Sequence, residues 1–449
     1  MKKTSLIISL FLVASLWTTT QAQPKQPTSN GYTTEYVELG RKTSLLYKPA
    51  VVSEKNAIGV VVMHSNDDYL GFPANSELSK RGYTVLATVP AEGDIMDEKI
   101  LNIKRAVEYL RNMPGINKVL LLGHSGGATV MTAYQMLAEQ GVDVLKTKIF
   151  SDYTANLANL PKADGMLLLD ANYGNAVMRL ISLDPNIHSN GKGNGNSNTL
   201  DLASPDNGYN ANGVSHYSDE FVKKYIDAQA SRLADLTKVA EQRFQLVKQG
   251  KGDYTDDEPF IVAGANQIRP FNKLFPQDLH LLSHTKKAWP LVHGDGSVTT
   301  EIILSVRAPM RADAKSDKLS ASMVTTVRGF LSACAIRVTD KFMIREDGFE
   351  GIDWTSNINN PIGNSEGITV PVLMMGMTGS WEYLAAEHIY NHIGSKDKSM
   401  AFVEGASHMF FADRDAEKFN NTKYGDTTTA LFNYVDKWLS QPGRFLPNK

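Results

Sequence analysis

The 449-residue chain has one cysteine, Cys334, so no disulfide can form within it. The fold must therefore be held together by its core rather than by covalent cross-links. Cys334 lies in an apolar-periodic stretch, residues 319–336, which favours a buried, unreactive thiol. The chain also lacks an excess of either charge, since its formal net charge at pH 7 is −2. A nearly balanced charge gives no support for nucleic acid or for an anionic membrane surface as a partner.

The N-terminal apolar run is too short to anchor the chain in a membrane. It extends from Leu6 to Trp17, after Lys2 and Lys3, and falls well short of the roughly 20 residues that a spanning helix needs. Small residues ending at Ala22 follow it, which is the layout of a cleavable signal peptide. We therefore expect residues 1–22 to direct export, to a periplasm or out of the cell, and to leave no stable membrane anchor.

Patterns for metal and nicotinamide chemistry are missing as well. No Gly-x-Gly-x-x-Gly turn follows the first predicted buried strand, residues 57–63. His280 and His284 are four residues apart, as are His388 and His392, and on a helix this spacing can bind zinc. Neither pair has the His-Glu order of a metalloprotease, and we interpret both pairs as surface or packing residues. The sequence thus predicts no cofactor and no metal site.

Buried strands and amphipathic helices alternate along the first half of the chain. Residues 57–63, 83–89 and 118–122 are continuous apolar runs, which are typical of strands buried in a parallel sheet. This alternation predicts a mostly parallel sheet covered by helices on both faces, with its chemistry at the carboxyl ends of the strands. The helix between the second and third runs has one apolar face, formed by Ile100, Ile103, Val107 and Leu110.

The third apolar run ends in the sequence Gly-His-Ser-Gly-Gly, residues 123–127, with Ser125 at its centre. A serine in a sharp turn from strand to helix needs small neighbours, because larger side chains would collide there. A helix is predicted over residues 128–140, and its first N–H groups would point to the same place and stabilise an oxyanion. This context favours Ser125 as a nucleophile over a serine in an ordinary glycine turn.

With this turn the chain resembles the α/β-hydrolase superfamily, over residues 53–174 and again from Gly367 to the C-terminus. The resemblance implies an α/β-hydrolase fold, in which a mostly parallel central sheet of about eight strands has helices on both faces. It also implies a nucleophile, an acid and a histidine in that order along the chain. Residues 23–174 and 367–449 would form this core, and residues 175–366 an inserted, mainly helical cap.

His408 is the candidate general base. It lies in a loop of small residues after a predicted strand at residues 398–403, which resembles the catalytic loop of the superfamily. The role that the resemblance implies is to take the proton of Ser125 and later to deliver it to the leaving group.

Three carboxylates are candidates for the acid. In the superfamily an aspartate follows the strand that corresponds to residues 368–375, whereas here the best-placed carboxylate is Glu382. Glutamate can serve, because the acid holds the imidazole tautomer and stabilises its charged form. Asp170, at the end of a predicted strand at residues 165–169, is the runner-up, and Glu387 is the third choice.

The oxyanion hole needs two N–H donors. Gly126, directly after the nucleophile, offers one. The other is expected from the loop after the first buried strand, which reads His64-Ser65 where the superfamily commonly has His-Gly. Ser65 and Asn66 are both candidates for this second donor.

These features predict an exported serine hydrolase that cleaves a small-molecule carboxylic ester through an acyl-enzyme on Ser125. The first alternative is an amide or peptide hydrolase with the same triad. The second is a catalytically inactive binding protein that has kept the fold, an interpretation to which the unusual Glu382 loop and the His64-Ser65 pair give some weight. The large cap would exclude water and select the acyl or alcohol portion of the substrate.

Overall fold

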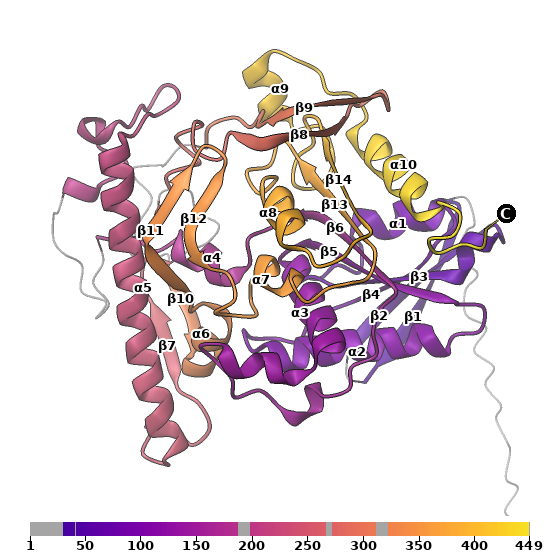
Figure 1. Ribbon diagram of the computed structural model, residues 1–449, viewed down its shortest axis with the longest axis horizontal. Coiled ribbons are helices and arrows are strands. Elements are labelled where there is room, and N and C mark those ends of the chain that lie inside the picture. Colours follow the sequence, from indigo (N-terminus) through magenta and orange to yellow (C-terminus); the bar gives the residue numbers. More distant parts are fainter. Residues whose placement is uncertain (1–29, 41, 187–197, 266–271, 311–321, 449) are drawn as a thin grey trace, which may run out of the picture.

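The computed structural model describes residues 30–448, except for residues 41, 187–197, 266–271 and 311–321. The predicted signal peptide, residues 1–22, lies outside the described residues. A central sheet has ten strands in the order β1-β2-β4-β3-β5-β6-β13-β14-β8-β9 (Figure 1). In chain order these are β1 (Tyr32–Leu39), β2 (Lys42–Pro49), β3 (Ile58–Val62), β4 (Thr84–Thr88), β5 (Lys118–Ser125), β6 (Gly165–Ala171), β8 (His284–Val292), β9 (Val298–Leu304), β13 (Val372–Met377) and β14 (Lys398–Val403).

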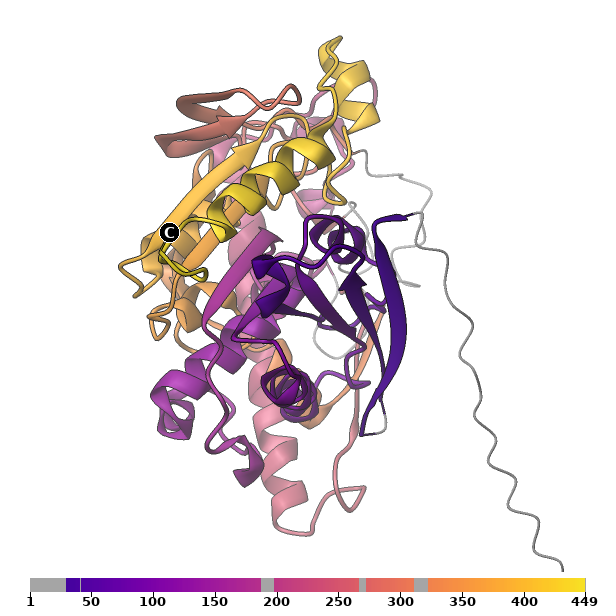
Figure 2. The same ribbon diagram turned by 90° about the vertical axis from the view of Figure 1, so that its right-hand side faces the viewer.

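The middle of the sheet is parallel, from β4 through β14, as the unbroken apolar runs predict. Every residue of β3 and β4 is buried, because these strands are covered on both faces. Antiparallel pairs finish both edges: β1 with β2 at one, and β8 with β9 at the other. Figure 2 shows these two pairs on opposite sides of the molecule.

Helices cover both faces of the sheet, and the sheet separates the core into two clusters. Val119 and Leu121 of β5 belong to the larger core cluster together with Ile100 of α2 (Met96–Asn112), and α3 (Gly126–Gln140) and α8 (Ala385–His392) complete this face. Leu122 of β5 faces the other way and belongs to a second cluster with Leu431 of α10 (Thr427–Leu439), beside α1 (Pro73–Lys80). The alternation of side chains along one strand therefore supplies both cores.

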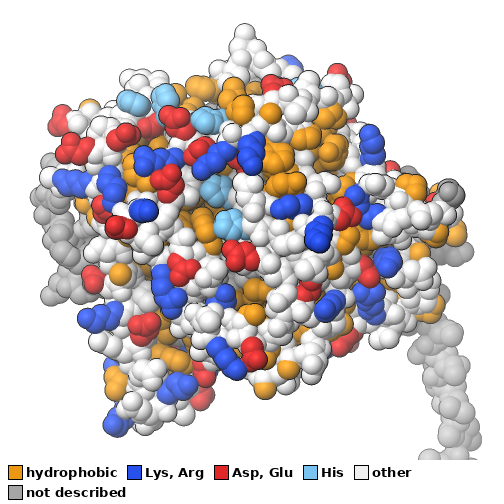
Figure 3. All heavy atoms as spheres, in the orientation of Figure 1, with side chains coloured by type: hydrophobic (Ala, Val, Ile, Leu, Met, Phe, Trp, Pro, Cys, Tyr) orange, Lys and Arg blue, Asp and Glu red, His pale blue; other side chains and the backbone are white. Residues whose placement is uncertain are grey.

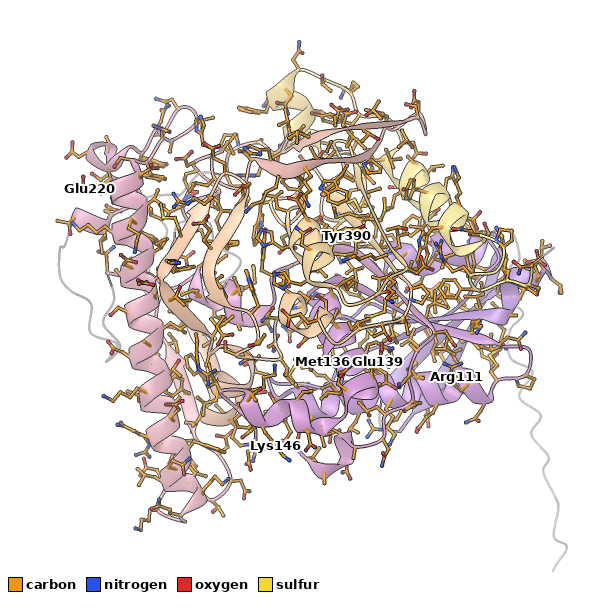
Figure 4. The ribbon with its side chains drawn as sticks, viewed as in Figure 1. Arg111, Met136, Glu139, Lys146, Glu220 and Tyr390 are labelled. Atoms are coloured by element: carbon orange, nitrogen blue, oxygen red, sulfur yellow. The ribbon has the colours of Figure 1, made fainter. Side chains whose placement is uncertain are left out.

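Residues 175–366, which were expected to form a mainly helical cap, lie between β6 and β13, but their described part contains six strands, two of which belong to the central sheet. Strands β8 and β9 extend the sheet beyond β14, which is why the sheet has ten strands rather than about eight. Tyr390 of α8 packs edge-on against Trp289 of β8, with ring centroids 5.0 Å apart, and so ties this edge to the core (Figure 4). The rest of the segment mixes helices with two two-stranded sheets: α4 (Asn175–Leu180), α5 (Asp219–Lys248), β7 (Pro259–Val262) with β10 (Met323–Thr326), α6 (Val327–Ala333), β11 (Arg337–Arg345) with β12 (Gly348–Asp353), and α7 (Pro361–Ser365).

Cys334 is buried, and burial raises the pKa of its thiol to about 12, so the thiolate is disfavoured as predicted. Among the helices of the described residues, none has both the length and the apolar character needed to cross a membrane.

Candidate active site

The turn at Ser125 joins β5 to α3. Ser125 has φ 53° and ψ −129°, a backbone conformation that costs a residue other than glycine about 1–3 kcal/mol. The glycines around it are needed because the chain passes close to itself. A Cβ on Gly123 would lie 2.5 Å from the Cα of Ala128, and one on Gly127 would lie 2.6 Å from the carbonyl oxygen of Met63. The predicted sharp turn from strand to helix is therefore present.

We expect Gly127→Ala to lower the free energy of unfolding by about 1–3 kcal/mol, because the added methyl meets a backbone oxygen of a buried strand end. Gly71→Ala is the matched control, since a Cβ there has nothing within 4 Å and its φ is not positive. Urea denaturation of both variants measures the difference. Equal midpoints for the two variants would show that the turn has room for a side chain at residue 127.

Two carboxylates lie against the imidazole of His408. The Nδ1 atom of His408 is 2.7 Å from Oδ2 of Asp170 and 3.3 Å from Oε2 of Glu382. Asp170 is fully buried, and its other oxygen accepts a hydrogen bond of 3.0 Å from the amide of Met377. Oε2 of Glu382 has no hydrogen-bond partner among the described residues. The structure thus brings together the first and second candidates for the acid, and the hydrogen bond goes to Asp170.

Glu387, the third candidate, lies elsewhere. Its carboxylate accepts hydrogen bonds from the amides of Lys286 and Lys287, at 2.9 and 3.2 Å, and from Nε1 of Trp289 at 2.7 Å. These bonds hold the start of β8 against α8. Glu387 is therefore engaged in the packing of the sheet edge and not in the site around His408.

A bulge in β6 turns Asp170 toward His408. The pairing of β5 with β6 shifts between His124 and Ser125, so that Ser125 pairs with Ala171 and Asp170 is the extra residue. Asp170 has φ 43°, in the left-handed region that aspartate tolerates better than most residues. Bulges re-aim side chains and occur beside active sites. Three of the six non-glycine residues with positive φ in the described chain, Ser125, Asp170 and Phe410, lie at this edge of the sheet.

The paired carboxylates change the proton affinity of His408. Burial alone would lower its pKa, but Glu382 and the hydrogen-bonded Asp170 outweigh this effect and raise the pKa to about 9. Burial raises the pKa of Glu382 to about 7, against the opposing effect of His408. Because these groups interact electrostatically, loss of a proton by one of them changes the pKa of the other. The neutral form of His408, which a general base requires, is therefore favoured by alkaline pH.

His124, inside the turn, packs against the ring of His408 and binds its carbonyl oxygen. The rings of the two histidines lie 4.4 Å apart, and Nε2 of His124 is 2.7 Å from the carbonyl oxygen of His408. Nδ1 of His124 is 2.7 Å from the hydroxyl of Tyr69. Since a carbonyl can only accept, Nε2 carries the proton and Nδ1 accepts from Tyr69. Burial holds the pKa of His124 well below its usual range, in keeping with this neutral form and with a positioning role.

The loop after β3 lies against the start of α3. A Cβ on Gly126 would be 2.3 Å from Oγ of Ser65, so this loop and the turn at Ser125 are in close contact. The amide of Asn66 donates a hydrogen bond of 3.2 Å to Nδ1 of His64, whose pKa burial lowers to about 4. The amide of Asn66 is therefore already engaged, which favours Ser65 over Asn66 as the second oxyanion donor beside Gly126.

Lys99, which no sequence motif marked as a site residue, stabilises the same loop. Nζ of Lys99 donates a hydrogen bond of 2.8 Å to Oδ1 of Asn66. The side chain is 1% exposed, and burial lowers the pKa of its ammonium to about 8. Lys99 lies four residues before Ile103, on the apolar face of α2. A lysine on the buried face of a helix is the signal in the sequence that could have revealed it.

A cavity of about 920 Å³ opens beside His408. The loop after β13 forms one wall and α9 (Arg414–Asn420) another. Apolar side chains supply much of its lining, including Met310, Trp381, Met409, Phe411 and Phe419. The charged or titratable residues of the lining are Arg307, Glu382, His408, Asp413, Asp415 and Lys418.

No family model matches the chain, and no curated protein matches it. Solved structures align with most of its length at low identity. Esterase B from Lactobacillus rhamnosis is 11% identical over 92% of this chain and 88% of that chain, with a TM-score of 0.37. A hormone-sensitive lipase from a metagenome library is 10% identical over 93% and 88%, with a TM-score of 0.39. Carboxyl esterase 2 from Tuber melanosporum is 11% identical over 93% and 89%, with a TM-score of 0.38.

The chain has the α/β-hydrolase fold, as predicted. This assignment rests on the strand order of the sheet and on the strained turn at the carboxyl end of β5. Ser125, Asp170 and His408 also follow one another in the order that this fold uses for nucleophile, acid and histidine.

Proposed function

We propose that the protein hydrolyses carboxylic esters through an acyl-enzyme on Ser125, with His408 as the base and Asp170 as the acid. The observation that carries the proposal is the 2.7 Å hydrogen bond from His408 to a buried aspartate, at the same sheet edge as the strained serine. Asp170 holds the proton of His408 on Nδ1 and leaves Nε2 to act on the serine hydroxyl. Asp170 thus takes the role that the sequence analysis gave first to Glu382.

The proposed reaction has two halves. Ser125 attacks the ester carbonyl as its proton passes to Nε2 of His408, and the amides of Gly126 and Ser65 stabilise the oxyanion. The tetrahedral intermediate then collapses, His408 returns the proton to the departing alcohol, and the acyl group stays on Ser125. Water then attacks this acyl-enzyme as its proton passes to His408. The second tetrahedral intermediate collapses when His408 gives this proton to Oγ of Ser125, which releases the carboxylic acid and restores the serine.

The cavity beside His408 supports a small ester with an apolar acyl or alcohol portion. Its apolar surface, with Trp381, Met409 and Phe411, matches such a group. We further propose that residues 1–22 export the protein, so that it meets its substrate outside the cytoplasm. An amide hydrolase with the same triad is the alternative, because the same groups could protonate an amine leaving group.

A fluorophosphonate probe tests the proposal. The mature protein, from Gln23 onward, is labelled at pH 7 and at pH 9 and analysed by intact mass and peptide mapping. We expect one adduct, on Ser125, that forms faster at pH 9 because His408 is then more often neutral. An ester and an amide of the same acyl group, assayed in parallel, separate the two hydrolase hypotheses.

The absence of label at both pH values from protein that is folded would contradict the proposal. It would favour the inactive binding protein, for which the raised pKa of His408 is the supporting observation, since an imidazolium cannot act as a base. Label on a serine other than Ser125 would contradict the assignment of the nucleophile.

A further inference from the structure

A second group of metal-binding side chains lies away from Ser125, at the N-terminal end of α5. His216 lies just before this helix, and Asp278 and His280 lie in the loop that leads to β8. One ligand atom from each of the three residues lies within 4.8 Å of the others. Figure 3 shows histidine and acidic side chains side by side over this end of the helix, which the label Glu220 marks in Figure 4.

The separations of the ligand atoms suit a tetrahedral ion. Nδ1 of His280 is 3.2 Å from Oδ1 of Asp278, and Nδ1 of His216 is 3.9 Å from Oδ2 of the same carboxylate. Ligands that bind zinc at 2.0–2.1 Å in a tetrahedron are about 3.3–3.4 Å apart. The observed distances lie on either side of this value. All three separations are at most 4.8 Å, so the three ligand atoms are close enough to surround one ion.

The central carboxylate is buried and held in place. Asp278 is 2% exposed, and its two oxygens accept hydrogen bonds from the amides of Tyr217, at 2.9 Å, and His280, at 3.1 Å. Such hydrogen bonds orient a carboxylate as the outer partners of metal ligands do. The two imidazole side chains, by contrast, are 74% and 65% exposed, so they can turn toward an ion. All three residues line one hollow of about 410 Å³, which leaves a fourth position open to water.

We propose that His216, Asp278 and His280 bind a divalent transition-metal ion, with zinc as the best fit. Two imidazoles and one carboxylate suit zinc, whereas magnesium and calcium prefer oxygen ligands alone. The ion joins the loop before α5 to the loop before β8, so it stabilises the inserted segment. This role is separate from the hydrolysis proposed at Ser125.

The sequence predicted no metal site, because the pair His280 and His284 lacks the His-Glu order of a metalloprotease and was interpreted as surface or packing residues. In the structure His284 begins β8, and its Nε2 lies 3.3 Å from a carboxylate oxygen of Glu346. His216 takes its place beside His280, with ring centroids 5.0 Å apart. Residues so far apart along the chain leave no local spacing that could reveal them.

One other group in the described chain meets the same distance criterion, namely Asp170, Glu382 and His408. The test must therefore show where the metal binds. Mature protein freed of metal with EDTA and dialysed is titrated with zinc chloride by calorimetry, and its melting temperature is measured with and without zinc. The variants are His216→Ala, His280→Ala and His408→Ala. The matched control is His392→Ala, since His392 also pairs with a carboxylate, Glu366 at 3.0 Å, but lies in no such group.

We expect one zinc ion per chain and a rise of several degrees in the melting temperature of the unaltered protein and of the control. His216→Ala and His280→Ala should each weaken zinc binding at least about tenfold and abolish the rise in melting temperature. His408→Ala should bind zinc as the unaltered protein does. The proposal is overturned if the unaltered protein binds no zinc, or if only His408→Ala weakens binding. The fluorophosphonate labelling of Ser125 is repeated on the EDTA-treated protein. Labelled protein that binds no zinc would overturn the metal site and leave the proposed hydrolase function in place.

Discussion

Ser125→Gly is expected to abolish ester hydrolysis and, at the same time, to stabilise the fold. Removal of the proposed nucleophile should lower kcat at least about 10³-fold. Glycine adopts the φ of 53° at this position freely, so the substitution relieves about 1–3 kcal/mol of backbone strain. The greater conformational freedom of glycine in the unfolded chain offsets about 0.5–1 kcal/mol of this stabilisation. The free energy of unfolding should therefore rise by about 1 kcal/mol, within a range of about 0–2.5 kcal/mol.

Ser125→Ala is the matched control, because alanine also lacks the hydroxyl but keeps the Cβ that makes this conformation costly. It should be as inactive as Ser125→Gly and close to the unaltered protein in stability. Urea denaturation and ester hydrolysis at pH 9 measure both properties for the three proteins. Equal stabilities of the alanine and glycine variants would show that the turn is not strained. Full activity in either variant would show that Ser125 is not the nucleophile.

The core of the fold could be predicted because its signals are local. The apolar runs of β3, β4 and β5 and the glycines around Ser125 lie within short stretches of sequence, so each element could be recognised by itself. The place of β8 and β9 in the central sheet could not be predicted in this way. The sequence indicates a hairpin at residues 288–305, but this hairpin lies within the expected cap, and only the pairing of β8 with β14 joins it to the sheet.

The choice between Glu382 and Asp170 as the proposed acid could not be made from the sequence for a different reason. Position along the chain favoured Glu382, because it follows the strand that usually precedes the acid. The bulge that directs Asp170 to His408 depends on the register between β5 and β6, two strands that meet only in the folded protein. Asp170 could be named as a candidate from its place at the end of a strand, but its hydrogen bond to His408 needed the tertiary structure.

Substitutions of the two carboxylates should have unequal effects on catalysis. Asp170→Asn removes the acceptor that holds Nδ1 of His408, and we expect kcat to fall at least about 10²-fold. Glu382 lies farther from Nδ1, at 3.3 Å, and Glu382→Gln should lower kcat at the optimal pH less than about tenfold. Asparagine and glutamine keep the shapes of the two side chains, so these variants remove charge with little change in packing.

The pH dependence separates the two roles further. Glu382 helps to raise the pKa of His408 to about 9, so loss of its charge lowers that pKa. Hydrolysis requires neutral His408, and activity therefore rises as the pH passes through this pKa. In Glu382→Gln the midpoint of that rise should move to lower pH by about one unit or more, which makes the variant relatively more active near pH 7. Profiles of kcat/KM against pH measure the shift. A larger loss of kcat in Glu382→Gln than in Asp170→Asn would identify Glu382 as the acid, and equal losses would mean that the two carboxylates share the role.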